Sequence, residues 1–554
     1  MKNIAIDRMC LILFAVLCGG TLFAQSTCYE NPEQVRKLSQ YLSREYTSSI
    51  TSVNAGVDAI TIKGSAIGGE NISLCEVTPY EDIVGTRVFK NRIPVNAGTF
   101  SKTLDRYIVK DGFRYDRTLS RWLIVKNNGD TDSIISHARY AGNIEAIQKT
   151  VAEKPSSKKG IGDCQATETM LRDLDDLRIT SATVNIRITT MMYSQSGTDR
   201  LEHSYGGQKY YFDKRQLQTL DESLIACRDR GIIVAAIILI NRKADSVDPV
   251  IGELFQHPDF TDAGRYSMPD MTTPESINAY AAALDFFAQR YCRTDKKYGR
   301  IHHWIMHNEV DSGREWTNMG DGKPVEVYMD TYVKSMRMCH NIVRRYDRYS
   351  QVMASHTHAW AVADNKDTYA SLDMLNILNS YCRAEGDFKW GLAFHCYPHD
   401  LREPKTWLDT IALYNHSTPI ITYKNLEVLD HWIKLPVNKY QGKDKRTLWL
   451  SENGTNSPTY SDEDLAEQAA GFAWGWTKIA ALDGIDAHQW HNWADHEEEF
   501  GLRIGLRKYP KDDYVRKPVW YAYQAAGTEN QDKVFQQYLP VIGIDSWNII
   551  QPVE

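Results

Sequence analysis

The sequence predicts an α/β protein in which a (β/α)8 TIM barrel follows a small β-sandwich-like domain. From residue 156 onward, eight short apolar segments read as strands, and most are followed by a segment with helical periodicity. Eight consecutive β/α units are typical of a closed barrel. Before them, residues 49–127 alternate apolar and polar positions between turn residues, as antiparallel strands do. A doubly wound open sheet is the alternative, but no strand end carries the G-x-G-x-x-G or P-loop pattern.

The first segment, residues 1–24, is predicted to be a secretory signal peptide. Lys2 and Arg8 flank the start of an apolar stretch, and Ala24 provides a small residue for cleavage. Leu17 precedes Cys18, where a lipoprotein signal would carry a small residue, so lipid anchoring is the less favoured alternative. We therefore expect a secreted or periplasmic protein with no membrane span, because no later segment has the roughly 18 unbroken apolar residues that a membrane helix needs.

Residues 25–155 are predicted to form the N-terminal β-rich domain with flanking helices at 32–46 and 144–151. Runs such as 59–63, 72–77 and 122–125 alternate as half-buried strands. Trp122 is the only tryptophan of this domain, so structural support is favoured over carbohydrate binding. A polar linker at 153–159 ends the domain.

The barrel domain is predicted to span residues 156–554. The run at 232–240 is apolar throughout, as expected of a parallel strand that is buried on both faces. Ser461 and Asp464 predict a helix N-terminus after the seventh strand. The expected strands are 159–162, 182–188, 232–240, 302–307, 351–355, 390–395, 447–451 and 485–489, and the expected helices are 166–177, 215–230, 274–293, 325–346, 461–481 and 518–527.

Two glutamates stand where the fourth and seventh strands end, namely Glu309 and Glu452. The active site of such a barrel lies at the carboxyl ends of its strands, so these two carboxylates should face each other. Retaining hydrolysis of a glycosidic bond needs such a pair: one acid protonates the leaving oxygen and later activates water, and the other attacks the anomeric carbon. The alternative is that both are solvated surface acids.

These residues resemble those of the retaining glycoside hydrolases of clan A, the 4/7 superfamily, over residues 156–554. The β-rich leader and barrel together look most like an uncharacterised family of secreted bacterial barrel proteins. The resemblance implies that Glu309 is the acid/base, that Glu452 is the nucleophile and that Asn308 holds the sugar 2-hydroxyl. It also implies a tyrosine near the nucleophile, Tyr397, with His395 beside it, and a sugar-site floor made by Trp490. Val310 departs from the clan, whose members often have proline there.

Other side chains are assigned by their chemistry. Arg187 is predicted to bind substrate or to orient Glu452, because a barrel tolerates arginine where it meets a carboxylate; a salt bridge elsewhere is the alternative. His356, His395 and His491 suit hydrogen bonding to sugar hydroxyls. A raised pKa of Glu309 is expected from the nucleophile's charge and from aromatic walls. The candidate walls are Trp304, Trp316, Trp360 and Trp493, of which Trp304 and Trp360 are expected to be core residues. The run 497–499 is expected to be a solvated acidic loop.

The function predicted from the sequence is a secreted retaining glycoside hydrolase that acts on an oligo- or polysaccharide. A non-catalytic glycan-binding protein on the same barrel is the alternative. The net charge of −7 argues against nucleic acid as a partner. We expect no cofactor and no metal. A metal hydrolase would need three or four converging nitrogen or oxygen ligands, and the His-x-His pair here follows strand five, whereas the metal-dependent amidohydrolase barrels carry it after strand one.

Overall fold

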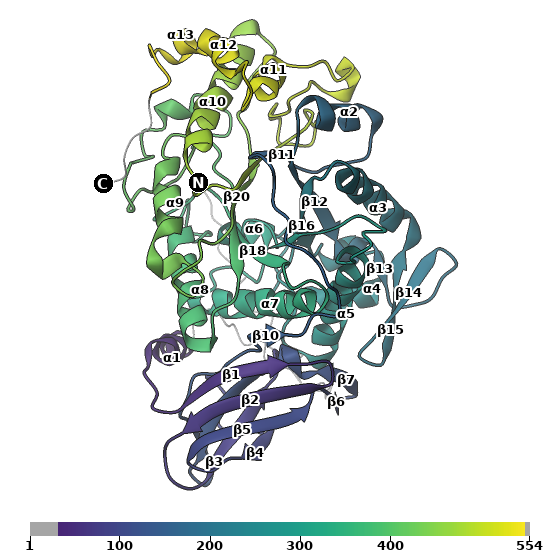
Figure 1. The fold of residues 1–554 in the computed structure, drawn as a ribbon, viewed down its shortest axis with the longest axis vertical. Coiled ribbons are helices and arrows are strands. Elements are labelled where there is room, and N and C mark those ends of the chain that lie inside the picture. The colour runs from purple at the N-terminus through teal and green to yellow at the C-terminus, as the bar shows by residue number, and fades with distance from the viewer. Residues whose placement is uncertain (1–31, 549–554) are drawn as a thin grey trace, which may run out of the picture.

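The computed structural model describes residues 32–548, and their central feature is a closed barrel of eight parallel strands (Figure 1). The predicted signal peptide lies outside the described residues. The barrel confirms the predicted fold class, and every strand lies within a few residues of its expected position. In barrel order the strands are β11 (Lys159–Ile161), β12 (Ser181–Arg187), β16 (Ile233–Leu239), β17 (His303–Met306), β18 (Gln351–His356), β19 (Trp390–Phe394), β20 (Leu448–Asn453) and β21 (Ala487–Trp490).

The strand β16 shows why an unbroken apolar run was the clearest barrel signal. Successive side chains point to opposite faces of the sheet. Because one face packs inside the barrel and the other against the helices, all seven residues of β16 are buried. Ile233, Ala235 and Ile237 join the cluster that fills the barrel interior. Val234 and Ala236 pack in the larger cluster between strands and helices.

Helices surround the barrel. Ser461 begins the helix after β20 as predicted, with its hydroxyl accepting a hydrogen bond from the Asp464 backbone N–H. Two further helices, α8 and α9, follow β18 and β19. The helices are α2 (Glu168–Asp176), α3 (Lys214–Asp229), α4 (Pro249–Phe255), α5 (Pro274–Tyr291), α6 (Gly313–Trp316), α7 (Val325–Tyr346), α8 (Ser371–Glu385), α9 (Leu426–Lys434), α10 (Asp462–Ala481), α11 (Pro518–Ala525), α12 (Gln531–Phe535) and α13 (Leu539–Ile542).

None of the helices within residues 32–548 is both long enough and apolar enough to cross a bilayer. A small sheet not foreseen from the sequence is inserted between β12 and α3. Its strands are β13 (Met192–Tyr193), β14 (Arg200–Tyr205) and β15 (Gln208–Asp213).

The N-terminal region consists of α1 (Pro32–Ser43), two four-stranded sheets and the two-stranded sheet β6-β7 (Figure 1). Trp122 is fully buried in the cluster between the sheets, so it is a core residue rather than an exposed sugar platform. One sheet has the order β10-β1-β2-β5 and the other β4-β3-β8-β9. The strands are β1 (Ser49–Ala55), β2 (Ala59–Ala66), β3 (Ile72–Val77), β4 (Arg92–Pro94), β5 (Gly98–Asp105), β6 (Tyr107–Lys110), β7 (Phe113–Asp116), β8 (Arg121–Asn127), β9 (Asp132–Ile134) and β10 (Asn143–Ile144).

The helix expected at residues 144–151 is wrong. Asn143 and Ile144 instead pair with the last two residues of β1 as a parallel strand. Further along, the backbone N–H of Ile147 donates to the carbonyl of Arg345. Pairing with other elements therefore overrides the helix-like pattern of this short segment.

A buried polar cluster joins the sandwich to the barrel. Glu385, at the end of α8, accepts hydrogen bonds from Arg121 of β8 and from the Tyr41 hydroxyl of α1, each at 3.0 Å. The side chains of Arg121 and Glu385 are only 3% and 1% exposed. An ion pair so deeply buried leaves an uncompensated charge when one partner is removed.

We therefore expect Glu385→Gln to destabilise the protein by about 3 kcal/mol or more, since Arg121 would stay buried without its counter-ion. The matched control is Glu168→Gln, which breaks the exposed Arg172–Glu168 pair and should cost no more than about 1 kcal/mol. Chemical denaturation of both variants measures the difference. Equal midpoints for the two would show that the cluster does not hold the sandwich to the barrel.

Candidate active site

The two predicted catalytic carboxylates lie at the same end of the barrel. Glu452 is the fifth residue of β20, whereas Glu309 follows the end of β17. The backbone of Glu309 is left-handed, with a φ of 40°, and so is that of His307, with a φ of 64°. Such backbone is uncommon outside glycine and clusters at functional sites. The Glu309 N–H is fixed by donation to the Ser355 hydroxyl of β18.

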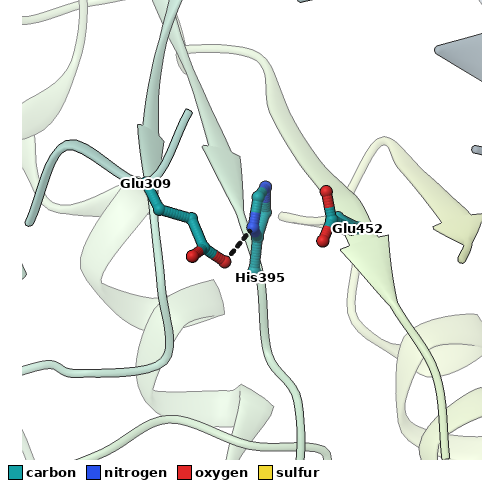
Figure 2. A group of neighbouring side chains, drawn as sticks. All are labelled: Glu309, His395 and Glu452. Atoms are coloured by element: carbon teal, nitrogen blue, oxygen red, sulfur yellow. Dashed lines mark hydrogen bonds and ion pairs between the residues drawn. The ribbon is translucent and has the colours of Figure 1, made fainter. Parts of the chain in front are cut away.

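His395 lies between the two carboxylates (Figure 2). One oxygen of Glu309, one ring nitrogen of His395 and one oxygen of Glu452 all lie within 4.8 Å of one another. The Nδ1 atom of His395 is 2.8 Å from Oε1 of Glu309. His395 is only 1% exposed. Its side chain therefore contacts Glu309, the predicted acid/base, and is not open to the cleft.

Burial sets the protonation of Glu309. The side chain is 13% exposed, and removal from water raises its pKa to about 7. The charge of Glu315 raises this pKa further, while His358 and His491 act in the opposite direction. Glu309 therefore keeps its proton at mildly acidic pH and is about half protonated at neutral pH, so it can serve as a general acid.

Glu452 is surrounded by groups that favour a carboxylate. The Tyr397 hydroxyl donates to its Oε1 at 3.1 Å, as the clan A resemblance implies. Burial lowers the pKa of His491, but the charges of Glu452 and Glu499 outweigh burial and raise it to about 9. A cationic imidazole therefore faces the predicted nucleophile at neutral pH. Among the described residues, Arg187 makes no hydrogen bond to Glu452.

Two adjoining cavities form a cleft over these residues. The larger lobe, of about 620 Å³, is lined by Glu309, Glu452, Asn308 and Tyr397 among others. The smaller lobe, of about 330 Å³, includes Glu452 but not Glu309. The wall common to both lobes consists of Asn185, Arg187, Ile237, Glu452, His491, His496 and Glu499.

The structure brings most predicted site residues to this cleft, but not all. Asn308, Tyr397 and Arg187 line it, and their roles toward a sugar stay predictions. Trp490 does not: its ring is fully buried, its N–H donates to the Ile504 carbonyl, and it packs on Phe472 of α10. The predicted tryptophan floor is therefore wrong, because this side chain points to the helix layer.

His356 is also placed differently from the prediction. It is 1% exposed and does not line the cleft, and its Nδ1 lies 3.7 Å from Oδ1 of Asp311. Burial lowers its pKa to about 3, so the ring is neutral. His356 thus supports the wall behind His395, whose N–H donates to its carbonyl, and does not bind sugar.

Sequence reasoning missed several cleft residues on long loops. Tyr266, Arg265 and Phe500 line the larger lobe, yet none belongs to a periodic pattern. Glu499 was expected to be solvated, but it lies in the wall common to both lobes and 3.7 Å from His491. Of the candidate aromatic walls, Trp316 and Trp493 line the cleft, whereas Trp304 and Trp360 are core residues.

Glu309, His395 and Glu452 are also the group that comes closest to a metal-binding arrangement in residues 32–548. Ligands of a zinc ion sit 2.0–2.2 Å from the metal, so neighbouring ligand atoms are about 3.4 Å apart. Here the three atoms spread up to 4.8 Å, and Nδ1 of His395 is engaged with Glu309. The arrangement fits proton transfer better than metal coordination.

Several solved structures with low sequence identity to the chain are glycoside hydrolases by name. A family 39 glycoside hydrolase from Bacteroides cellulosilyticus is 13% identical, with a TM-score of 0.41, over 88% of this chain and 83% of its own. A glucosidase from Croceicoccus marinus is 14% identical, with a TM-score of 0.42, over 68% and 69%. A β-glucuronidase from Bacteroides uniformis is 10% identical, with a TM-score of 0.39, over 87% and 51%, so the chain spans about half of its length.

No curated protein sequence matches the chain. Residues 151–550, which contain the whole barrel, match the family of unknown function DUF5722. An uncharacterised family of barrel proteins was the expectation from the sequence. The chain belongs to the DUF5722 family.

Proposed function

We propose that this protein is a retaining glycoside hydrolase that cleaves glycosidic bonds of an oligo- or polysaccharide by double displacement. The observation that carries the proposal is the pair Glu309 and Glu452 at the ends of the fourth and seventh barrel strands, with oxygen atoms within 4.8 Å. Carboxyl groups about 5–5.5 Å apart suit retention, whereas inversion needs about 6.5–9.5 Å to hold a water molecule. The positively charged start of residues 1–24 supports export as part of the same proposal.

Each acid has a role that its surroundings favour. Glu452, beside the Tyr397 hydroxyl and cationic His491, attacks the anomeric carbon as a carboxylate. Glu309, in its protonated form, gives its proton to the leaving oxygen as that bond breaks. In the second step Glu309 takes a proton from water, whose oxygen displaces Glu452 from the anomeric carbon.

The test is a panel of aryl glycosides and polysaccharides, with the anomeric configuration of the first-formed product followed by NMR. Turnover with retained configuration is the expected result. An inverted product would overturn the retaining mechanism. Binding of glycans without turnover across the panel would favour the non-catalytic glycan-binding alternative.

The pKa of Glu309 gives a pH prediction. The general acid must carry its proton, so kcat/KM should be highest below the pKa of about 7 and fall as the pH rises through it. Measuring kcat/KM between about pH 5 and pH 9 on a substrate with a poor leaving group locates this alkaline limb, the fall of kcat/KM with rising pH. With Glu309→Gln the limb should disappear, and a limb that persisted in that variant would belong to another group.

A further inference from the structure

Three aromatic side chains gather in the larger lobe of the cleft, and the proposed chemistry does not use them. Tyr266 and Trp316 stack, with ring centroids 6.1 Å apart and an angle of 27° between the planes. Phe500 lines the same lobe and is 51% exposed. An exposed phenylalanine in a cleft contributes little to the core, so its apolar surface is available to a ligand.

Arg265 ties these rings into one surface. Its guanidinium lies 5.2 Å from the centroid of the Trp316 ring and 4.7 Å from that of Phe500. Its Nε donates to Glu315 at 3.0 Å, and the side chain is 50% exposed. We call Tyr266, Trp316, Phe500 and Arg265 the aromatic platform.

Backbone hydrogen bonds fix the loop of Arg265 and Tyr266 against the segment that carries Trp316. The Arg265 N–H donates to the Glu315 carbonyl at 2.7 Å, and the Asn318 N–H donates to the Tyr266 carbonyl at 2.8 Å. These bonds join the loop before α5 to the segment after β17. A ligand would therefore meet a preformed surface and lose less entropy on binding.

The side of the cleft occupied by the platform indicates which part of a substrate it meets. Glu309 lines the larger lobe and not the smaller one, whereas Glu452 lines both. The group that receives the proton from Glu309 is the leaving oxygen. The leaving group must therefore lie in the larger lobe, where the platform is.

We propose that the aromatic platform is the leaving-group subsite and that it binds the ring of a second sugar. This inference rests on the proposed glycoside hydrolase function. The apolar face of a pyranose ring packs on the aromatic rings, and the exposed guanidinium of Arg265 donates hydrogen bonds to hydroxyls. The natural substrate then has a sugar on each side of the bond that is cleaved, as in an oligo- or polysaccharide, rather than a small non-sugar leaving group.

The test compares two kinds of substrate that share the glycone but differ in the leaving group. The first is a panel of α- and β-glycosyl fluorides of glucose, galactose, mannose, xylose and glucuronic acid, and the second consists of tetrasaccharides of the same sugars. Fluoride is too small to reach the platform. Trp316→Ala should lower kcat/KM for the tetrasaccharide about tenfold or more. For the matching glycosyl fluoride, kcat/KM should stay within about twofold of the wild-type value.

Two controls accompany this variant. Trp316→Phe keeps an aromatic face and should recover most of the tetrasaccharide activity. Tyr521→Ala removes an exposed aromatic side chain of α11 that does not line the cleft and should change neither substrate. If Trp316→Ala fails to fold, Phe500→Ala at its exposed position provides the same comparison.

The outcomes separate the subsite from the proposed function. Equal losses on fluoride and tetrasaccharide, or no loss on either, would overturn the subsite while the hydrolase function stands. A wild-type protein that turns over neither kind of substrate would overturn both. A selective loss on the tetrasaccharide supports the subsite.

Discussion

Glu452→Ala should abolish turnover of every glycoside, with kcat lowered about 10⁴-fold or more. Without this carboxylate no glycosyl-enzyme can form, however good the leaving group is. Added azide can enter the vacated space and attack the anomeric carbon directly, giving a glycosyl azide of inverted configuration. The measurement is kcat on an activated aryl glycoside with and without azide.

The matched control for this variant is Glu498→Ala, which removes a carboxylate from the same lobe without touching the reacting centre. It should keep most of the activity. A glycosyl azide of retained configuration from Glu452→Ala would mean that the two acids have exchanged roles. Unchanged hydrolysis in this variant would end the clan A assignment.

Glu309→Ala should fail in a different way. On natural glycosides its loss should approach that of Glu452→Ala, because a sugar leaving group needs its oxygen protonated; general acid catalysis is worth about 10²–10⁴-fold. On 2,4-dinitrophenyl glycosides the first step should continue, because that leaving group departs as an anion. The glycosyl-enzyme then accumulates, since no base activates water.

Azide distinguishes this variant from a merely damaged protein. It needs no general base, so it should release the glycosyl-enzyme of Glu309→Ala as a glycosyl azide of retained configuration. A burst of dinitrophenol followed by slow turnover, with the slow phase accelerated by azide, is the expected record. Equal loss on natural and activated substrates, without rescue, would remove Glu309 from the acid/base role.

The barrel was predictable because its physical signals are local. β16 is apolar at all seven positions, and each of the eight strands has its own short apolar segment. Counting strands then placed Glu309 and Glu452 at one end, since parallel strands end at the same edge of the sheet. The short segment at 144–151 lacked such a signal, because its pairing with β1 depends on residues about 90 positions away.

The site was less predictable where a role depends on the direction of a side chain. Trp490 and His356 each end a strand, as expected, but their rings are buried and do not line the cleft. Phe500 and Tyr266 come from long loops whose paths no periodicity describes. For such residues the sequence gives the chemistry of the side chain but not its position.

The segment after β17 combines two tasks within a few residues. Glu309 supplies the proton and Trp316 of α6 supplies an aromatic face, whereas Glu452 is fixed within the hydrogen-bonded ladder of β20. Under the proposed function, substitutions at Trp316 change the preference for a leaving group and leave the nucleophile in place, so the two properties can evolve separately.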